Sequence, residues 1–167
     1  MGYSRWDDND WKSYSAVTVN STREQIFKNS NIFESFDPSR IAIRESRDSE
    51  QNPESTPIII GLDVTGSMGI IAEVMAKEGL GTLVKGILDR EPVVDPHILI
   101  MGIGDQTDRA PLQATQFESD IRIAEQLSNI WLEGAGGGNG SEAYDLPWYF
   151  AAHKTSIDSF EKRGKKG

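Results

Sequence analysis

The sequence contains no cysteine, which excludes both disulfide bonds and thiolate metal ligands. No stretch of it approaches the roughly 20 consecutive apolar residues that cross a membrane. Its opening stretch, MGYSRWDDNDWKSYS, lacks the apolar centre of a secretion signal. We therefore expect a cytoplasmic protein.

Basic charge is also scarce. The chain carries 17 Lys and Arg residues against 26 Asp and Glu, a formal net charge of -9. An acidic surface repels phosphate groups, which argues against nucleic acids and anionic membranes as partners. The basic cluster at 162–166 is short enough to be a solvated helix end. The identity of any protein partner stays open.

Composition divides the chain in two. Residues 1–56 are rich in Ser, Asn and Asp, and we interpret them as a polar N-terminal extension and linker. Ser21 and Glu24 have the spacing of a capping box, which predicts a short helix, and residues 41–43 predict a brief strand. Four aromatic residues indicate that the extension docks either on its own domain or on another surface: Tyr3, Trp6, Trp11 and Tyr14.

Residues 57–167 alternate between apolar strands and helical patterns. Strands are expected at 58–62 and 98–103, with a weak edge strand at 112–117. Helices are expected at 70–88, after a cap at Asp120, and from Pro147 to Gly164. This order predicts an α/β fold with a doubly wound, mainly parallel, Rossmann-like sheet. Two firm strands make a poor core, so we expect the fold to be incomplete in this chain and its remaining strands to lie outside it.

The first expected strand ends in three alternating polar residues, Asp63, Thr65 and Ser67. In open α/β sheets, ligands bind at the carboxyl ends of the strands. Asp105 follows the second strand, and the glycine-rich loop at 134–142 precedes the last helix. Three separate segments thus converge on one edge of the sheet, which predicts a site there.

Several interpretations of this stretch are weaker. A phosphate-binding P-loop needs a Lys after its second glycine, but Ser67-Met68 stands there. A nucleophilic Asp usually works with a second acid two residues on, where this chain has Thr65. A helix cap accounts for Ser67 alone and leaves the alternating series unexplained.

A metal site fits the pattern best. Alternate residues of a tight loop can turn their oxygens toward one point, and Gly66 lets the backbone bend. One carboxylate and two hydroxyls suit a hard cation such as Mg²⁺, with Mn²⁺ or Ca²⁺ as alternatives.

The segment from Asp63 to Met68, after an apolar strand, resembles the DxSxS motif of von Willebrand factor type A (vWA) domains, the metal-ion-dependent adhesion site (MIDAS). Thr65 stands where the family usually has serine. The loop from Gly136 to Glu142 resembles the family's glycine-rich ligand loop, with Asn139 in place of the usual Thr or Asp. The form it resembles is the intracellular bacterial or phage type, truncated at the C-terminus, and 57–167 would be the N-terminal part of the domain.

This resemblance implies a doubly wound fold that binds protein partners and is not an enzyme. The implied metal ligands are Asp63, Thr65, Ser67 and Asn139, and possible second-tier ligands are Asp105 and Glu142. In the family a further aspartate follows the next strand, which lies beyond this chain. A different hypothesis stays open, in which Asp63 serves a metal-dependent phosphoryl transferase or phosphohydrolase.

Overall fold

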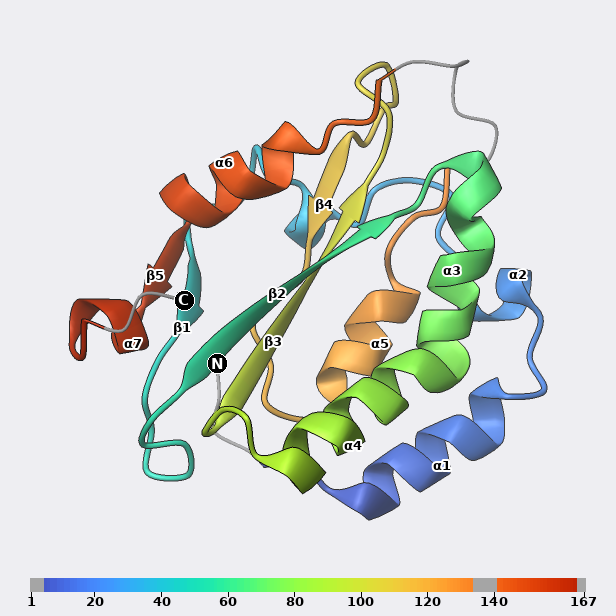
Figure 1. Cartoon of the computed structure of the whole chain (residues 1–167). Helices are drawn as coiled ribbons and strands as arrows, with labels where there is room; N and C mark the ends of the chain where they lie inside the picture. Colours follow the sequence, from blue (N-terminus) through green and yellow to red (C-terminus); the bar gives the residue numbers. More distant parts are fainter. Residues whose placement is uncertain (1–4, 134–140, 165–167) are drawn as a thin grey trace.

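A three-stranded sheet forms the centre of the fold (Figure 1). The structure, a computed structural model, describes residues 5–133 and 141–164. Strand β2 (Thr56–Asp63) pairs in parallel with β3 (Pro96–Ile103), and β3 pairs in antiparallel with β4 (Leu112–Ala114). The predicted strands at 58–62 and 98–103 are confirmed. The weak edge strand is also present but ends at Ala114.

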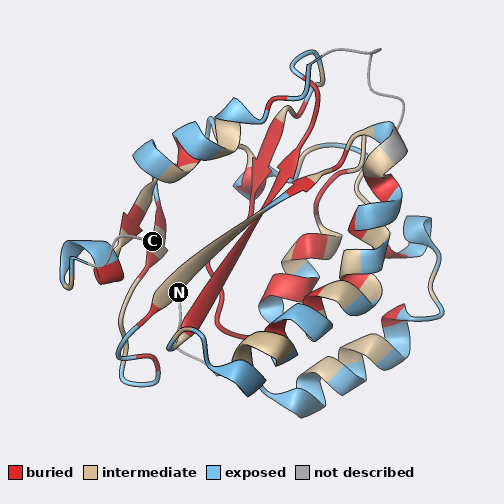
Figure 2. Ribbon diagram, in the orientation of Figure 1, coloured by how far each residue is buried: buried red, intermediate tan, exposed pale blue. Residues whose placement is uncertain are grey.

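Strand β3 is buried along its whole length (Figure 2). Ile98 and Ile100 belong to a core shared with the helices of one face, whereas Leu99 and Met101 belong to a second core on the other. A strand covered on both faces carries mainly apolar side chains, which is why the sequence from Ile98 onward shows no polar alternation. Both faces of the sheet are therefore covered by packed side chains, as in an α/β fold.

The helical layer on one face lies where helices were predicted, at 70–88 and after Asp120. It consists of α3 (Gly69–Val74), a π-helical turn (Met75–Gly79), α4 (Leu80–Arg90) and α5 (Arg122–Ser128). The first three run on as one irregular helix, which ends where Glu91 adopts a left-handed φ of 46°. Among the described helices, none is both long and apolar enough to cross a membrane.

The N-terminal segment packs on this helical layer. It contains α1 (Asp8–Thr18), α2 (Arg23–Ile26) and a 3₁₀ turn (Glu34–Phe36). The capping box is formed by Thr22 and Gln25, one residue later than the spacing predicted. Trp6, Trp11 and Tyr14 pack against the same core as α4, so these aromatic residues dock on the chain's own domain.

The predicted strand at 41–43 is displaced. The strand is β1 (Arg44–Ser46), which pairs in parallel with β5 (Thr155–Ile157). Ile41 is instead a buried side chain of the second core. Only Ile41 of the triplet is buried, and it packs with the sheet and with Phe150 of α6 (Asp145–His153), whereas Ile43 is 46% exposed.

The predicted single helix from Pro147 to Gly164 is wrong. Helix α6 ends at His153, β5 follows, and α7 (Asp158–Glu161) forms a separate short turn. The amide of Arg44 donates to the carbonyl of Lys154 at 2.7 Å and starts the pairing of β1 with β5. Phe160, in α7, is 57% exposed. The long-range strand pairing overrides the local helical pattern.

Candidate metal centre

Asp63 and Thr65 form the best-defined part of the site. Asp63 is the last residue of β2, and the Val64 amide still donates to the Ile103 carbonyl at 2.9 Å, so the strand end is fixed against β3. The Thr65 amide and hydroxyl both donate to Asp63 Oδ1, at 2.9 and 2.6 Å. Two of the predicted ligands are therefore in direct contact.

The side chains of the other two predicted ligands lie outside the part of the chain that the structure describes. Ser67 lies in the 3₁₀ turn Gly66–Met68, directly after Thr65, and only its backbone is described. Asn139, with the glycines at 134 and 136–138, lies outside the described residues.

The predicted second-tier acids, Asp105 and Glu142, are paired through their backbones. They form an isolated antiparallel bridge, flanked by hydrogen bonds from the Gln106 amide to the Ser141 carbonyl (3.2 Å) and from the Ala143 amide to the Gly104 carbonyl (3.0 Å). The end of β3 is thus joined to the segment that follows the glycine-rich loop. The sequence predicted this convergence of separate segments.

Tyr144 is a site residue that the sequence reasoning missed. Its hydroxyl donates to Asp63 Oδ2 at 2.8 Å, so both carboxylate oxygens of Asp63 accept hydrogen bonds. Tyr144 immediately precedes α6 and is half exposed. One indication of this role was present in the sequence, which is that Tyr144 lies only two residues after the predicted ligand Glu142.

Asp108 is a second residue that the sequence reasoning missed. Its Oδ2 accepts a hydrogen bond from the Asp105 amide at 2.8 Å, and its own amide donates to the Asp105 carbonyl at 3.1 Å. The turn from Asp105 to Asp108 leaves no room for a side chain at Gly104, where a Cβ would lie 2.7 Å from Asp108 Oδ2. Asp108 Oδ1 is buried and has no hydrogen-bond partner among the described residues. Asp108 therefore adds a third carboxylate to those of Asp105 and Glu142.

The acids of the site differ in their pKa. Burial pushes the pKa of Asp63 upward, but hydrogen bonds from Thr65 and Tyr144 outweigh it and leave that pKa lowered. Burial, followed by the charges of Asp108, Glu142 and Asp63, raises the pKa of Asp105. Asp63 is thus ionised at neutral pH. A positive charge placed near it would relieve the repulsion among the carboxylates of Asp63, Asp105, Asp108 and Glu142.

The donor set fits a hard cation. Two ligands at 2.0–2.1 Å on adjacent corners of an Mg²⁺ octahedron lie about 2.9 Å apart. Asp63 Oδ1 and Thr65 Oγ1 are 2.6 Å apart, so the hydroxyl needs mainly to turn its proton away for both oxygens to face one ion. Within 5–133 and 141–164, no group of three or more His, Cys, Asp or Glu side chains is arranged to hold a metal. A centre here would depend on hydroxyl and amide oxygens.

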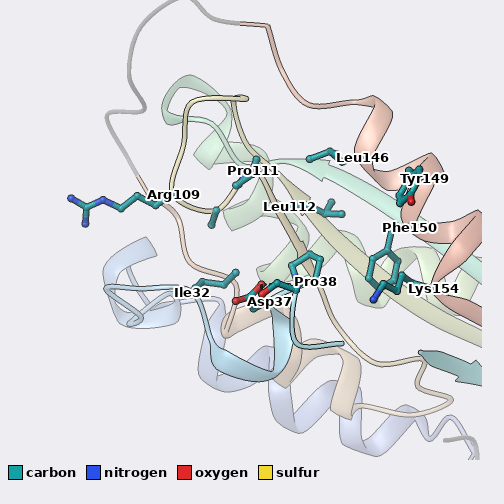
Figure 3. A pocket seen from close by; sticks show the side chains of 12 residues that line it. Ile32, Asp37, Pro38, Arg109, Pro111, Leu112, Leu146, Tyr149, Phe150 and Lys154 are labelled. Carbon is teal, nitrogen blue, oxygen red and sulfur yellow. Dashed lines mark hydrogen bonds between the residues drawn. The ribbon is translucent and has the colours of Figure 1, made fainter. Parts of the chain in front are cut away.

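Two cavities lie near this edge. One of about 180 Å³ borders the candidate centre directly, and its lining includes Thr65, Gly66 and Gly69. A larger apolar cavity of about 430 Å³ lies between α6 and the turn that precedes β4, with Leu112, Leu146 and Phe150 among its walls (Figure 3). The larger cavity includes none of the candidate ligands and is a separate feature.

No protein-family model matches the sequence, and neither a curated protein nor a solved structure gives a significant match to it.

Proposed function

We propose that this chain is a metal-dependent protein-binding module of the vWA type, in which a divalent cation at a MIDAS coordinates an acidic residue of a partner protein. Mg²⁺ is the preferred ion, with Mn²⁺ or Ca²⁺ as alternatives, and the module is cytoplasmic and not an enzyme. The observation that carries the proposal is the contact of Asp63 Oδ1 with the Thr65 hydroxyl at the carboxyl end of β2. This contact places two hard oxygen donors 2.6 Å apart.

The strand arrangement supports the proposal. A parallel pair followed by an antiparallel edge strand, with helices on both faces, is compatible with a Rossmann-like α/β sheet. Ligands of such sheets bind where Asp63 and Asp105 lie, beyond the carboxyl ends of β2 and β3.

The edge of β2 opposite β3 also supports it. The amides of Thr56 and Val64 donate toward the β3 side, so by alternation the backbone groups of Ile59 and Gly61 face the other edge. The described residues include no strand paired on that edge. Arg163 donates to the Ser55 carbonyl at 2.8 Å, so the chain reaches the start of β2 shortly after α7. This edge of β2 is therefore open to pairing with a further strand, which the proposed fold requires.

Each residue of the site has a role in this proposal. Asp63 supplies the one full negative charge of the inner set, whereas Thr65, Ser67 and Asn139 supply neutral oxygens. With only one carboxylate among its direct ligands, a bound cation would retain its attraction for an outside carboxylate. Asp105 and Glu142 act at longer range, by orienting water around the ion.

Thermal unfolding with added Mg²⁺ or Mn²⁺ tests the proposal. A ligand at 100 times its dissociation constant stabilises the folded state by about 2.7 kcal/mol. The wild-type melting temperature should rise with cation, and Asp63→Asn, which keeps the shape of the side chain, should abolish the rise. The matched control is Asp7→Asn at the cap of α1, which should leave the response intact. An unresponsive wild type contradicts the proposal.

One observation favours the second candidate, a metal-dependent phosphoryl transferase or phosphohydrolase. The charge of Asp63 contributes to the raised pKa of Asp105, so the two carboxyl groups interact. Asp105 could therefore serve as the second acid of a phosphoryl-transfer site, which the sequence next to Asp63 lacks. Turnover of a panel of phosphoesters, lost in Asp63→Asn, would favour the enzyme. Cation-dependent stabilisation with no turnover would favour the binding module.

A further inference from the structure

Arg23 extends over the loop of the candidate metal centre. It begins α2, in the N-terminal segment, and its guanidinium covers Gly69, where a Cβ would lie 3.2 Å from Nη1. Arg23 also lines the cavity of about 180 Å³ whose other walls include Thr65 and Gly66. A cationic side chain thus borders the same space as a predicted metal ligand.

The guanidinium of Arg23 is weakly partnered. Its one ion pair among the described residues joins Nη2 to Glu24 Oε1 at 3.7 Å, beyond hydrogen-bonding distance. The side chains of Arg23 and Glu24 are 44% and 75% exposed, and such surface pairs contribute little to stability. The five N–H donors of a guanidinium form a planar fork that matches a carboxylate. Arg23 can therefore accept an anion without losing a strong contact.

The cavity favours a carboxylate on a short apolar stem. Phe27, Val64 and Leu132 give it apolar walls beside the Arg23 guanidinium and the Thr65–Gly66 backbone. Glu24 and Asp63 lie close by, so a group with two negative charges, such as a phosphate, meets more repulsion than a single carboxylate.

We propose that Arg23 is a partner-recognition residue, which binds the acidic side chain of the partner protein together with the cation. This inference rests on the proposed function and gives residues 1–56 a part in it. The carboxylate of a partner Asp or Glu enters the smaller cavity, and the Arg23 guanidinium pairs with it. Specificity for an acidic partner residue then comes from two positive groups on different segments of the chain.

Binding of a blocked peptide measures this directly. The probe is acetyl-Gly-Asp-Gly-amide, with the Asn analogue as the uncharged control, and the full chain is titrated in saturating Mg²⁺ while the amide NMR signals of Thr65, Gly66 and Gly69 are followed. Arg23→Gln should weaken binding of the Asp peptide about five- to tenfold. The matched control is Lys28→Gln, which makes the same charge change on an exposed side chain and should stay within twofold.

A second measurement separates recognition from structural damage. Because Arg23 is a positive charge near the centre, Arg23→Gln should leave the Mn²⁺ affinity unchanged or raise it slightly, while peptide affinity falls. Glu24→Gln should strengthen peptide binding, because it removes a competing carboxylate. A parallel loss of both affinities in Arg23→Gln would overturn the inference, since that pattern means a distorted loop.

The two proposals fail in different ways. If Mn²⁺ binds but Arg23→Gln leaves peptide affinity unchanged, the inference about Arg23 is wrong and the metal-dependent module stands. If the peptide binds through Arg23 without any effect of cation, Arg23 binds a carboxylate on its own, and both the metal proposal and the joint recognition by Arg23 and the cation are wrong. If neither cation nor peptide binds, both are wrong.

Discussion

The phenolic oxygen of Tyr144 lies 2.8 Å from Asp63 Oδ2, although 81 residues separate the two in sequence. This bond ties the residue before α6 to the residue that ends β2. It also occupies the carboxylate oxygen that Thr65 leaves free. Under the proposed function, the Tyr144 hydroxyl and a cation compete for the same carboxylate.

Tyr144→Phe should therefore strengthen cation binding. Loss of one hydrogen bond to Asp63 is worth about 1 kcal/mol, or roughly fivefold in Mn²⁺ affinity, and the same loss should lower stability without cation by a similar amount. Isothermal titration with Mn²⁺ and urea unfolding measure the two effects. Tyr149→Phe, on the exposed side of α6, is the control and should change neither. Weaker cation binding in Tyr144→Phe would mean that the phenol assists the site.

Trp11 should be the main anchor of the N-terminal segment. It stacks on Trp6 with ring centroids 6.1 Å apart, and its ring covers Gly81 of α4, where a Cβ would lie 3.2 Å away. Because Trp11 is only partly buried, Trp11→Ala should cost about 2–3 kcal/mol in urea unfolding. Val17→Ala on the same helix, 72% exposed, should stay within about 0.5 kcal/mol. Equal small effects would indicate that α1 does not stabilise the domain.

His97 should make the fold less stable in mild acid. Burial lowers its pKa to about 4, and its Nδ1 lies 3.1 Å from the Ser46 hydroxyl. The unfolded chain protonates this residue near pH 6.5, whereas the folded chain resists protonation until about pH 4. Its contribution is therefore present above pH 6.5 and is lost as pH falls toward 4, by about 3 kcal/mol.

His97→Gln separates this effect from the protonation of carboxylates. Between pH 6.5 and 4, its unfolding free energy should fall by about 3 kcal/mol less than that of the wild type, as measured by urea unfolding at each pH. His153→Gln is the matched control, because that side chain is exposed. Parallel curves for wild type and His97→Gln would mean that the buried imidazole is not linked to folding.

The features that depend only on neighbouring residues in the sequence were predicted best. The strands β2 and β3 are unbroken apolar runs, and the Asp63–Thr65 contact spans two residues, so both follow from local pattern and backbone geometry. The approach of Asp105 to Glu142 was predictable because the carboxyl ends of α/β strands share one edge with neighbouring loops.

Features that depend on distant contacts were missed. Strand β5 exists because it pairs with β1, more than a hundred residues earlier, and its own three residues are too few to show a strand pattern. The Tyr144–Asp63 bond and the position of Arg23 over Gly69 likewise join segments that local periodicity cannot relate. In each case tertiary packing decides the outcome over local propensity.

Paramagnetic broadening by Mn²⁺ tests the central claim most directly. In amide NMR spectra of the full chain, substoichiometric Mn²⁺ should broaden the signals of Thr65, Gly66 and Ala143 first. Asp63→Asn should remove this selective loss, and Asp7→Asn should retain it. Uniform broadening, or broadening centred elsewhere and unaffected by Asp63→Asn, would contradict a metal centre at the end of β2.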